Sequence, residues 1–393
     1  MSSSIIHQID WKQFCQTKIT NKTFGFSLVD EIINSDLVHL DWETLGFSFE
    51  DLPIRMVKIG RGKIKILLWS QMHGDEPTAT AAIFDLINFF TDAIHHQELK
   101  NNILTSCTLY FIPVINPDGM EKFTRRNAQQ IDINRDFLAQ QSPEGKILRT
   151  IREKIKPNFA FNLHDQDSLY SIPKSKKTVA ISLLAPAFDE TLAVNWNREQ
   201  AIKVIICINE ALQKLVPQQV GRFNDEFEPR AFGDNFQKAG AATILIESGS
   251  LINDPEKQEI RKLNFYALLS ALEVISNQTY QEKDLINYFM IPVQKKELFH
   301  VLLKNCSIQN SDKSYKIDIG LNYTDIFDQK TRTLQKHYQV ADIGNLSNYN
   351  AFETIDATSL ILIGEPKFEQ IANLELKNTN HQTIIWWKAG IRV

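Results

Sequence analysis

Short apolar runs alternate with amphipathic stretches of helical length between about residues 54 and 276, and this alternation limits the fold more than any other feature. The apolar runs include "KIKILLWSQ" (63–71), "TSCTLYFIPVI" (105–115), "NFAFNL" (158–163) and "AATILIES" (241–248). Stretches such as "NREQAIKVIICINEALQKLV" (197–216) lie between them. Apolar strands alternating with helices are typical of an α/β domain whose sheet is covered on both faces. We therefore predict an α/β fold with a mixed, mostly parallel sheet flanked by helices.

The chain is expected to have three parts. Residues 1–53 are predicted to form a helix and loop extension packed on the main domain, which spans 54–287. Residues 288–393 contain short alternating runs such as "SYKIDIGLNY" separated by Asn, Ser, Asp and Gly. This pattern of short alternating runs and turn residues predicts a small β-rich C-terminal domain. Within the main domain, "IRMVKIG" and "KIKILLWSQ" are predicted to be strands joined by a hairpin turn at "RGK".

Charge and cysteine content exclude several classes of protein. The formal net charge of -4 gives no electrostatic reason to expect nucleic acid or an anionic membrane as a partner. The four cysteines form no CxxC pair, which suits a reducing compartment. The opening "MSSSIIHQIDWKQF" does not read as a secretory signal, and no apolar run is long enough to span a bilayer. We expect a cytoplasmic protein of undetermined oligomeric state.

Ionisable side chains follow several of the predicted strands. His73 and Glu76 come after "IKILLW", His164 comes directly after "NFAFNL", and Glu247 follows "ATILI". In an open α/β sheet, ligands bind beyond the carboxyl ends of the strands. A capped turn explains any one of these residues, but it explains the whole set poorly. We therefore expect them to lie together at one edge of the sheet.

These residues have the chemistry of a hydrolytic metal site. Two histidines and a carboxylate are a familiar ligand set for catalytic zinc, which keeps a further position open for water. His73, Glu76 and His164 are the expected ligands, and Glu247 is then free to act as a base.

The chain resembles the zinc carboxypeptidases of the funnelin or M14 type. The resemblance rests on "HGDE" (73–76), "NPDG" (116–119), "RRNAQQIDINRDF" (125–137), "NLHD" (162–165) and "ILIES" (244–248). It implies an eight-stranded mixed sheet, one zinc ion per chain, and hydrolysis of a C-terminal peptide-type bond. His73, Glu76 and His164 match the zinc ligands of the family, Asp132 matches the acid that holds the first ligand histidine, and Glu247 matches the catalytic glutamate.

The same resemblance assigns the substrate contacts. Asn134 and Arg135 match the pair that grips the terminal carboxylate of the substrate. Arg125 stands where bacterial relatives place the arginine that stabilises the oxyanion, although Arg126 competes for this role. The expected partner is thus a peptide or peptide-like molecule with a free C-terminal carboxylate, such as a cell-wall fragment.

Two features depart from the family pattern, and two other functions stay open. The loop "GRFNDEFEPRAFGDNFQKAG" lacks the tyrosine of digestive members, and Asp165 replaces their serine. Asp165 is expected to orient the metal site, to favour a positive group on the substrate, or to form a salt bridge. The first alternative function is a zinc-dependent deacylase of N-acyl amino acids. The second is a non-catalytic metal-bearing binding protein, which would have no need of Glu247.

Overall fold

The computed structural model describes residues 8–173, 175, 177–310 and 313–393. These residues form two compact units. One comprises the chain up to Ser168 together with Val179–Gln294, and the other comprises Leu169–Thr178 with Lys295–Val393. The predicted division into 1–53, 54–287 and 288–393 stays a prediction, and its first seven residues lie outside the described part.

The first unit is built on an eight-stranded sheet with the order β1-β2-β4-β3-β5-β9-β7-β8. The strands β3, β4, β5 and β9 at its centre are all parallel to one another, whereas β1, β2 and β7 pair antiparallel with their inner neighbours. Their carboxyl ends therefore meet at one edge, as expected from the sequence. The strands are β1 (Trp42–Phe47), β2 (Pro53–Gly60), β3 (Ile64–Ser70), β4 (Cys107–Ile112), β5 (Phe159–Asp165), β7 (Ile181–Leu184), β8 (Val220–Arg222) and β9 (Ala242–Ser248).

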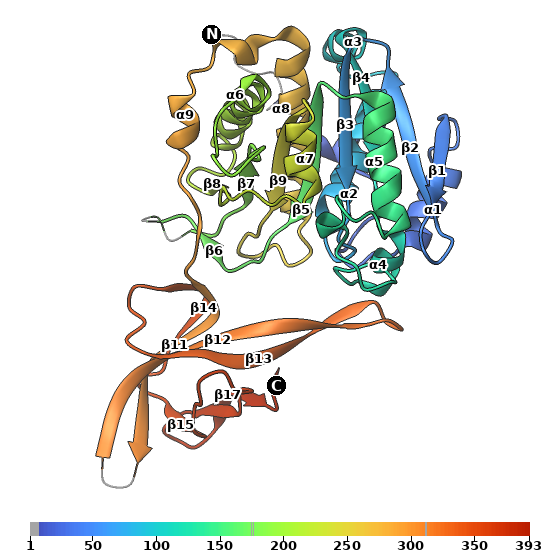
Figure 1. Cartoon of the computed structure of the whole chain (residues 1–393). Helices are drawn as coiled ribbons and strands as arrows, with labels where there is room; N and C mark the ends of the chain where they lie inside the picture. Colours follow the sequence, from blue (N-terminus) through green and yellow to red (C-terminus); the bar gives the residue numbers. More distant parts are fainter. Residues whose placement is uncertain (1–7, 174, 176, 311–312) are drawn as a thin grey trace. The chain divides into compact units, whose positions relative to one another are not determined.

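Helices cover both faces of this sheet (Figure 1). Successive residues of β3 face opposite sides, so Ile66 and Leu68 pack into one apolar core while Leu67 and Trp69 pack into the other. The first core is covered by α1 (Phe26–Asn34), α2 (Thr78–Thr91), α3 (Gln97–Ser106), α6 (Trp196–Leu212) and α8 (Gln258–Asn277). The second is covered by α5 (Pro143–Ile155) and α7 (Phe232–Lys238). The shorter helices are α4 (Pro117–Lys122), α9 (Ile286–Phe289) and the 3-10 turns η2 (Trp11–Gln13), η3 (Ile133–Arg135) and η4 (Thr279–Glu282).

The predicted hairpin between β2 and β3 is wrong, because β4 lies between these two strands. The connection at "RGK" instead runs against the start of β4, where the Gly62 amide donates to the carbonyl of Cys107 at 3.1 Å. A Cβ at Gly62 would lie 1.9 Å from the backbone carbon of Ser106, so only glycine fits.

The region 1–53 also differs from the expected helix and loop, since Trp42–Phe47 forms the edge strand β1. The part of this region before α1 is tied to the helices by a buried carboxylate. Asp85 of α2 accepts hydrogen bonds from the Trp11 ring and the Gln16 amide, both at 2.8 Å, and it pairs with Arg261 of α8.

The second unit is β-rich, as predicted. One sheet has the order β13-β12-β11-β14, the other has the order β15-β16-β17-β18, and a short pair joins β10 to β6. Side chains from both four-stranded sheets, including Leu303, Leu321 and Trp387, share one buried core. The strands are β6 (Tyr170–Ser171), β10 (Lys295–Lys296), β11 (Leu298–Asn310), β12 (Lys313–Asp328), β13 (Thr333–Gly344), β14 (Asn350–Asp356), β15 (Ile361–Ile363), β16 (Leu374–Lys377), β17 (Thr383–Lys388) and β18 (Ile391–Arg392).

None of the helices in the described ranges combines the length and the apolar character needed to cross a membrane.

Candidate active site

The loop after β3 turns sharply and is held in place by the segment "NPDG". Gln71 adopts a left-handed backbone conformation with φ of 51°, and its side-chain Nε2 donates to the backbone carbonyl of Gly74 at 2.8 Å. A Cβ at Gly74 would lie 1.9 Å from the backbone carbon of Gly119, so the two segments touch through backbone atoms. Asn116 accepts from the Gly119 amide and donates to the carbonyl of Met72. The family motif "NPDG" therefore supports the loop that carries His73.

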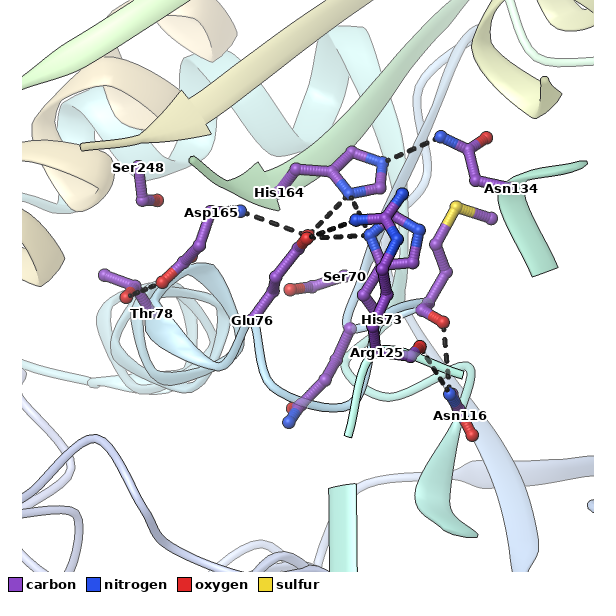
Figure 2. A network of polar contacts seen from close by, with 12 residues as sticks. Ser70, His73, Glu76, Thr78, Asn116, Arg125, Asn134, His164, Asp165 and Ser248 are labelled. Carbon is purple, nitrogen blue, oxygen red and sulfur yellow. Dashed lines mark hydrogen bonds and ion pairs between the residues drawn. The ribbon is translucent and has the colours of Figure 1, made fainter. Parts of the chain in front are cut away.

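His73, Glu76 and His164 converge at the carboxyl edge of the sheet (Figure 2). Their potential ligand atoms all lie within 4.8 Å of one another, and all three residues are buried. Glu76 reaches both imidazoles, with its Oε1 at 2.8 Å from Nδ1 of His73 and its Oε2 at 2.7 Å from Nδ1 of His164. The two Nδ1 atoms are 3.2 Å apart. Two imidazoles and a carboxylate aimed at a common point fit a zinc ion.

Burial and the contacts within the cluster shift the pKa values of its side chains in opposite directions. Burial lowers the pKa of His73, but the carboxylates of Glu76 and Asp132 outweigh it and raise that pKa to about 9. Burial favours the neutral form of Glu76, yet the two imidazoles hold the pKa of this carboxyl well below its ordinary value. For His164 burial prevails and lowers the pKa. Because metal ligation needs neutral imidazoles, binding of a metal here should release the proton of His73.

Glu247 lies on the strand beside His164. The parallel strands β5 and β9 place His164 and Glu247 opposite each other in register, and Glu247 is only 9% exposed. Burial, followed by the negative charge of Glu76, raises the pKa of Glu247 well above its ordinary value. The position and the raised pKa suit a group that takes up and returns a proton.

Asp132 and Arg125 surround the outer side of His73. Asp132 Oδ1 lies 3.1 Å from Nε2 of His73, which fixes the imidazole so that Nδ1 faces the centre of the cluster. Arg125 donates to Asp132 Oδ2 at 3.1 Å and to Glu76 Oε1 at 3.3 Å. Arg126 instead donates to the carbonyl of Gln130 at 2.8 Å. Of the two arginines that compete for the oxyanion role, the structure brings Arg125 to the cluster.

Asn134 and Arg135 lie on η3, beside the cluster. The side-chain nitrogen Nδ2 of Asn134 is 3.5 Å from Nε2 of His164. The side-chain oxygen of Asn134 accepts a hydrogen bond from the backbone amide of Phe232 at 3.0 Å. Nη1 of Arg135 donates to the carbonyl of Asn134 at 2.8 Å, and its Nε lies 3.2 Å from Oε2 of Glu228. Glu228 was not singled out by the sequence, because no motif or spacing links it to Arg135.

Asp165 forms the salt bridge that was one of its expected roles. Its Oδ2 lies 2.9 Å from Nζ of Lys257 and accepts a 2.5 Å hydrogen bond from Thr78 at the start of α2. Its backbone amide donates to Oε2 of Glu76 at 3.2 Å. Lys257 and Thr78 thus support the position of the backbone that contacts Glu76, and nothing in their sequence context indicated this.

Similarity to known proteins agrees with this geometry. Residues 31–295 match the zinc carboxypeptidase family, M14. Carboxypeptidase SOL1 of Arabidopsis thaliana is 31% identical over 137 residues, which cover 31% of this chain and 28% of that protein. Carboxypeptidase 2 of Trichophyton rubrum is 26% identical over 103 residues, covering 26% of this chain and 19% of that protein. The chain therefore spans less than a third of the length of these relatives.

Solved structures of this family share the fold. A metallo-carboxypeptidase from Burkholderia cenocepacia superposes with a TM-score of 0.51 at 16% identity, covering 65% of this chain and 68% of the other. Carboxypeptidase A from Helicoverpa armigera gives 0.51 at 14% identity, covering 71% of this chain and 82% of the other. The family match spans most of the first unit, including every residue of the cluster and its neighbours. The chain belongs to the zinc carboxypeptidase family.

Proposed function

We propose that the chain is a metallocarboxypeptidase that removes the C-terminal residue of a peptide or peptide-like substrate. The observation that carries the proposal is the convergence of His73, Glu76 and His164 on one point, with Glu247 on the neighbouring strand. Two imidazoles and a carboxylate would hold one zinc ion per chain. When bound, zinc supplies a Lewis acid and lowers the pKa of water towards about 7.

The protein groups then have separate tasks in this proposal. Glu247 accepts a proton from the attacking water and delivers it to the leaving nitrogen. Arg125 donates to the oxyanion that develops on the scissile carbonyl, a contact typically worth about 3–4 kcal/mol. Asn134 and Arg135 bind the terminal carboxylate, for which a planar guanidinium is well suited. Asp132 keeps His73 oriented, as its 3.1 Å contact with Nε2 indicates.

A peptide library tests the proposal and its alternatives. The zinc-loaded protein is incubated with a mixed library of peptides, and released amino acids are identified by mass spectrometry. We expect single C-terminal residues to be released from peptides with a free C-terminus and not from amidated peptides. Hydrolysis of N-acyl amino acids without release from peptides would indicate the deacylase instead. Inactivity on both, with zinc bound, would favour the non-catalytic binding protein. A cytoplasmic location stays a prediction.

A further inference from the structure

Arg135 is the proposed anchor for the substrate carboxylate, and a carboxylate of the protein already lies on it. Glu228 belongs to the segment between β8 and α7, and its Oε2 lies 3.2 Å from Nε of Arg135. Both side chains are partly exposed, at 26% for Glu228 and 38% for Arg135. The pair is therefore accessible to solvent and to an incoming ligand.

A carboxylate can bind a guanidinium side-on or end-on, and the contact between Glu228 and Arg135 affects both ways of binding. A side-on contact uses Nε, which faces Glu228. An end-on contact uses Nη1 and Nη2, and Nη1 already donates to the carbonyl of Asn134, so a ligand bound there would share one guanidinium group with Glu228. The substrate must thus displace Glu228 from Arg135 or bind beside a like charge.

Glu228 is held by more than Arg135. Arg230 donates from Nε to Oε1 at 2.9 Å and from Nη2 to Oε2 at 2.7 Å, and the backbone amide of Glu228 donates to Asp234 at 3.0 Å. The hydrogen bonds from Arg230 lower the pKa of Glu228 to about 2, so the side chain stays charged at neutral pH. When Glu228 leaves Arg135, it keeps Arg230 as a partner, so its charge is not left unpaired.

The segment is also fixed to the residues that carry the anchor. Phe232 donates its amide to the side-chain oxygen of Asn134 at 3.0 Å, and Phe137 donates its amide to the carbonyl of Arg230 at 3.2 Å. Phe232 itself is fully buried in the core beneath α7. These contacts place Glu228 beside Arg135 as part of the fold.

We propose that Glu228 is a built-in competitor for the terminal carboxylate, occupying Arg135 until a substrate or product displaces it. This inference rests on the proposed role of Arg135 as the carboxylate anchor. Because the competition concerns only the anchor, it should weaken every ligand with a free terminal carboxylate by the same factor. It should leave the chemical step unchanged.

The test is Glu228→Gln, which removes the charge and keeps the shape. For a short N-blocked peptide with a free C-terminus, KM should fall about two- to fivefold, the range expected for a partly exposed ion pair. The inhibition constant of the released free amino acid should fall by the same factor, while kcat stays constant. Glu226→Gln is the matched control, because Glu226 lies in the same segment and contacts Asn224 rather than Arg135.

The outcomes separate this inference from the proposed function. An unchanged or higher KM in Glu228→Gln, with the preference for free over amidated peptides intact, would overturn the competitor role alone. An equal fall of KM in Glu226→Gln would also overturn the competitor role, since the effect would then come from the change in net charge. Equal cleavage of amidated and free peptides by the unaltered protein would overturn the anchor itself, and the competitor role with it. Thermal unfolding of both variants checks that they fold, and Glu228→Ala gives a second measurement.

Discussion

Replacing Glu247 by glutamine gives the sharpest test of the proposed mechanism. The change preserves the size of the side chain and its ability to hydrogen-bond, but glutamine cannot accept a proton. Loss of a general base typically slows catalysis by about 10²–10⁴-fold, which corresponds to roughly 3–5 kcal/mol in the activation barrier. Glu247 is only 9% exposed, so a water molecule cannot easily replace its oxygen as the base.

The structure also predicts what this substitution does to stability. Burial and the charge of Glu76 raise the pKa of Glu247 well above its ordinary value, so the folded protein disfavours the charged form. A group with a raised carboxyl pKa destabilises the fold once the pH exceeds its unfolded value, and neutral glutamine does not. The variant should therefore be at least as stable as the unaltered metal-free protein at neutral pH. This difference should vanish in acid.

The assay compares kcat, zinc content and thermal unfolding of the unaltered protein, Glu247→Gln and Glu144→Gln. Glu144 is the matched control, because it is a fully buried carboxylate that binds the Phe49 amide and the side chain of Asn127. We expect Glu247→Gln to be folded, zinc-loaded and nearly inactive, and Glu144→Gln to be folded, zinc-loaded and active. Near-normal turnover in a zinc-loaded Glu247→Gln protein would refute the mechanism. Loss of zinc in that variant would instead make Glu247 a ligand.

Three further predictions concern the metal, the anchor and pH. His73→Ala and His164→Ala should each reduce zinc from about one ion per chain to a small fraction, and full occupancy in both by metal analysis would contradict the ligand assignment. Arg135→Lys should raise KM about tenfold or more on free-acid peptides, because an ammonium group cannot make a two-pronged contact; an unchanged KM would argue against the anchor. Burial raises the pKa of Asp234 to about 6 from 3.8, so its charge should cost stability increasingly between about pH 4 and pH 6. Asp234→Asn should gain up to about 3 kcal/mol in chemical denaturation at about pH 8 and nothing near pH 4, and an equal gain at both would contradict this.

The sequence by itself determined most helices and strands and the ionisable side chains at the carboxyl ends of the strands. Apolar runs and helical periodicity are local properties, so they predicted the α/β fold and the β-rich C-terminal part. The position of His73, Glu76, His164 and Glu247 at or just beyond the carboxyl ends of strands is also local, and parallel strands bring such ends together. Their convergence at one edge could therefore be predicted before any tertiary contact was known.

Only the tertiary structure decided the pairings between distant segments. The insertion of β4 between β2 and β3 depends on backbone hydrogen bonds, which every residue type except proline can form, so the sequence did not predict this strand order. Arg125 and Arg126 are adjacent and chemically identical, and the backbone of the folded loop directs only Arg125 to the cluster. Lys257 reaches Asp165, and Glu228 reaches Arg135, across about 90 residues in each case. Such long-range ion pairs arise from how the chain folds back on itself, because a charged residue in the sequence carries no information about its partner.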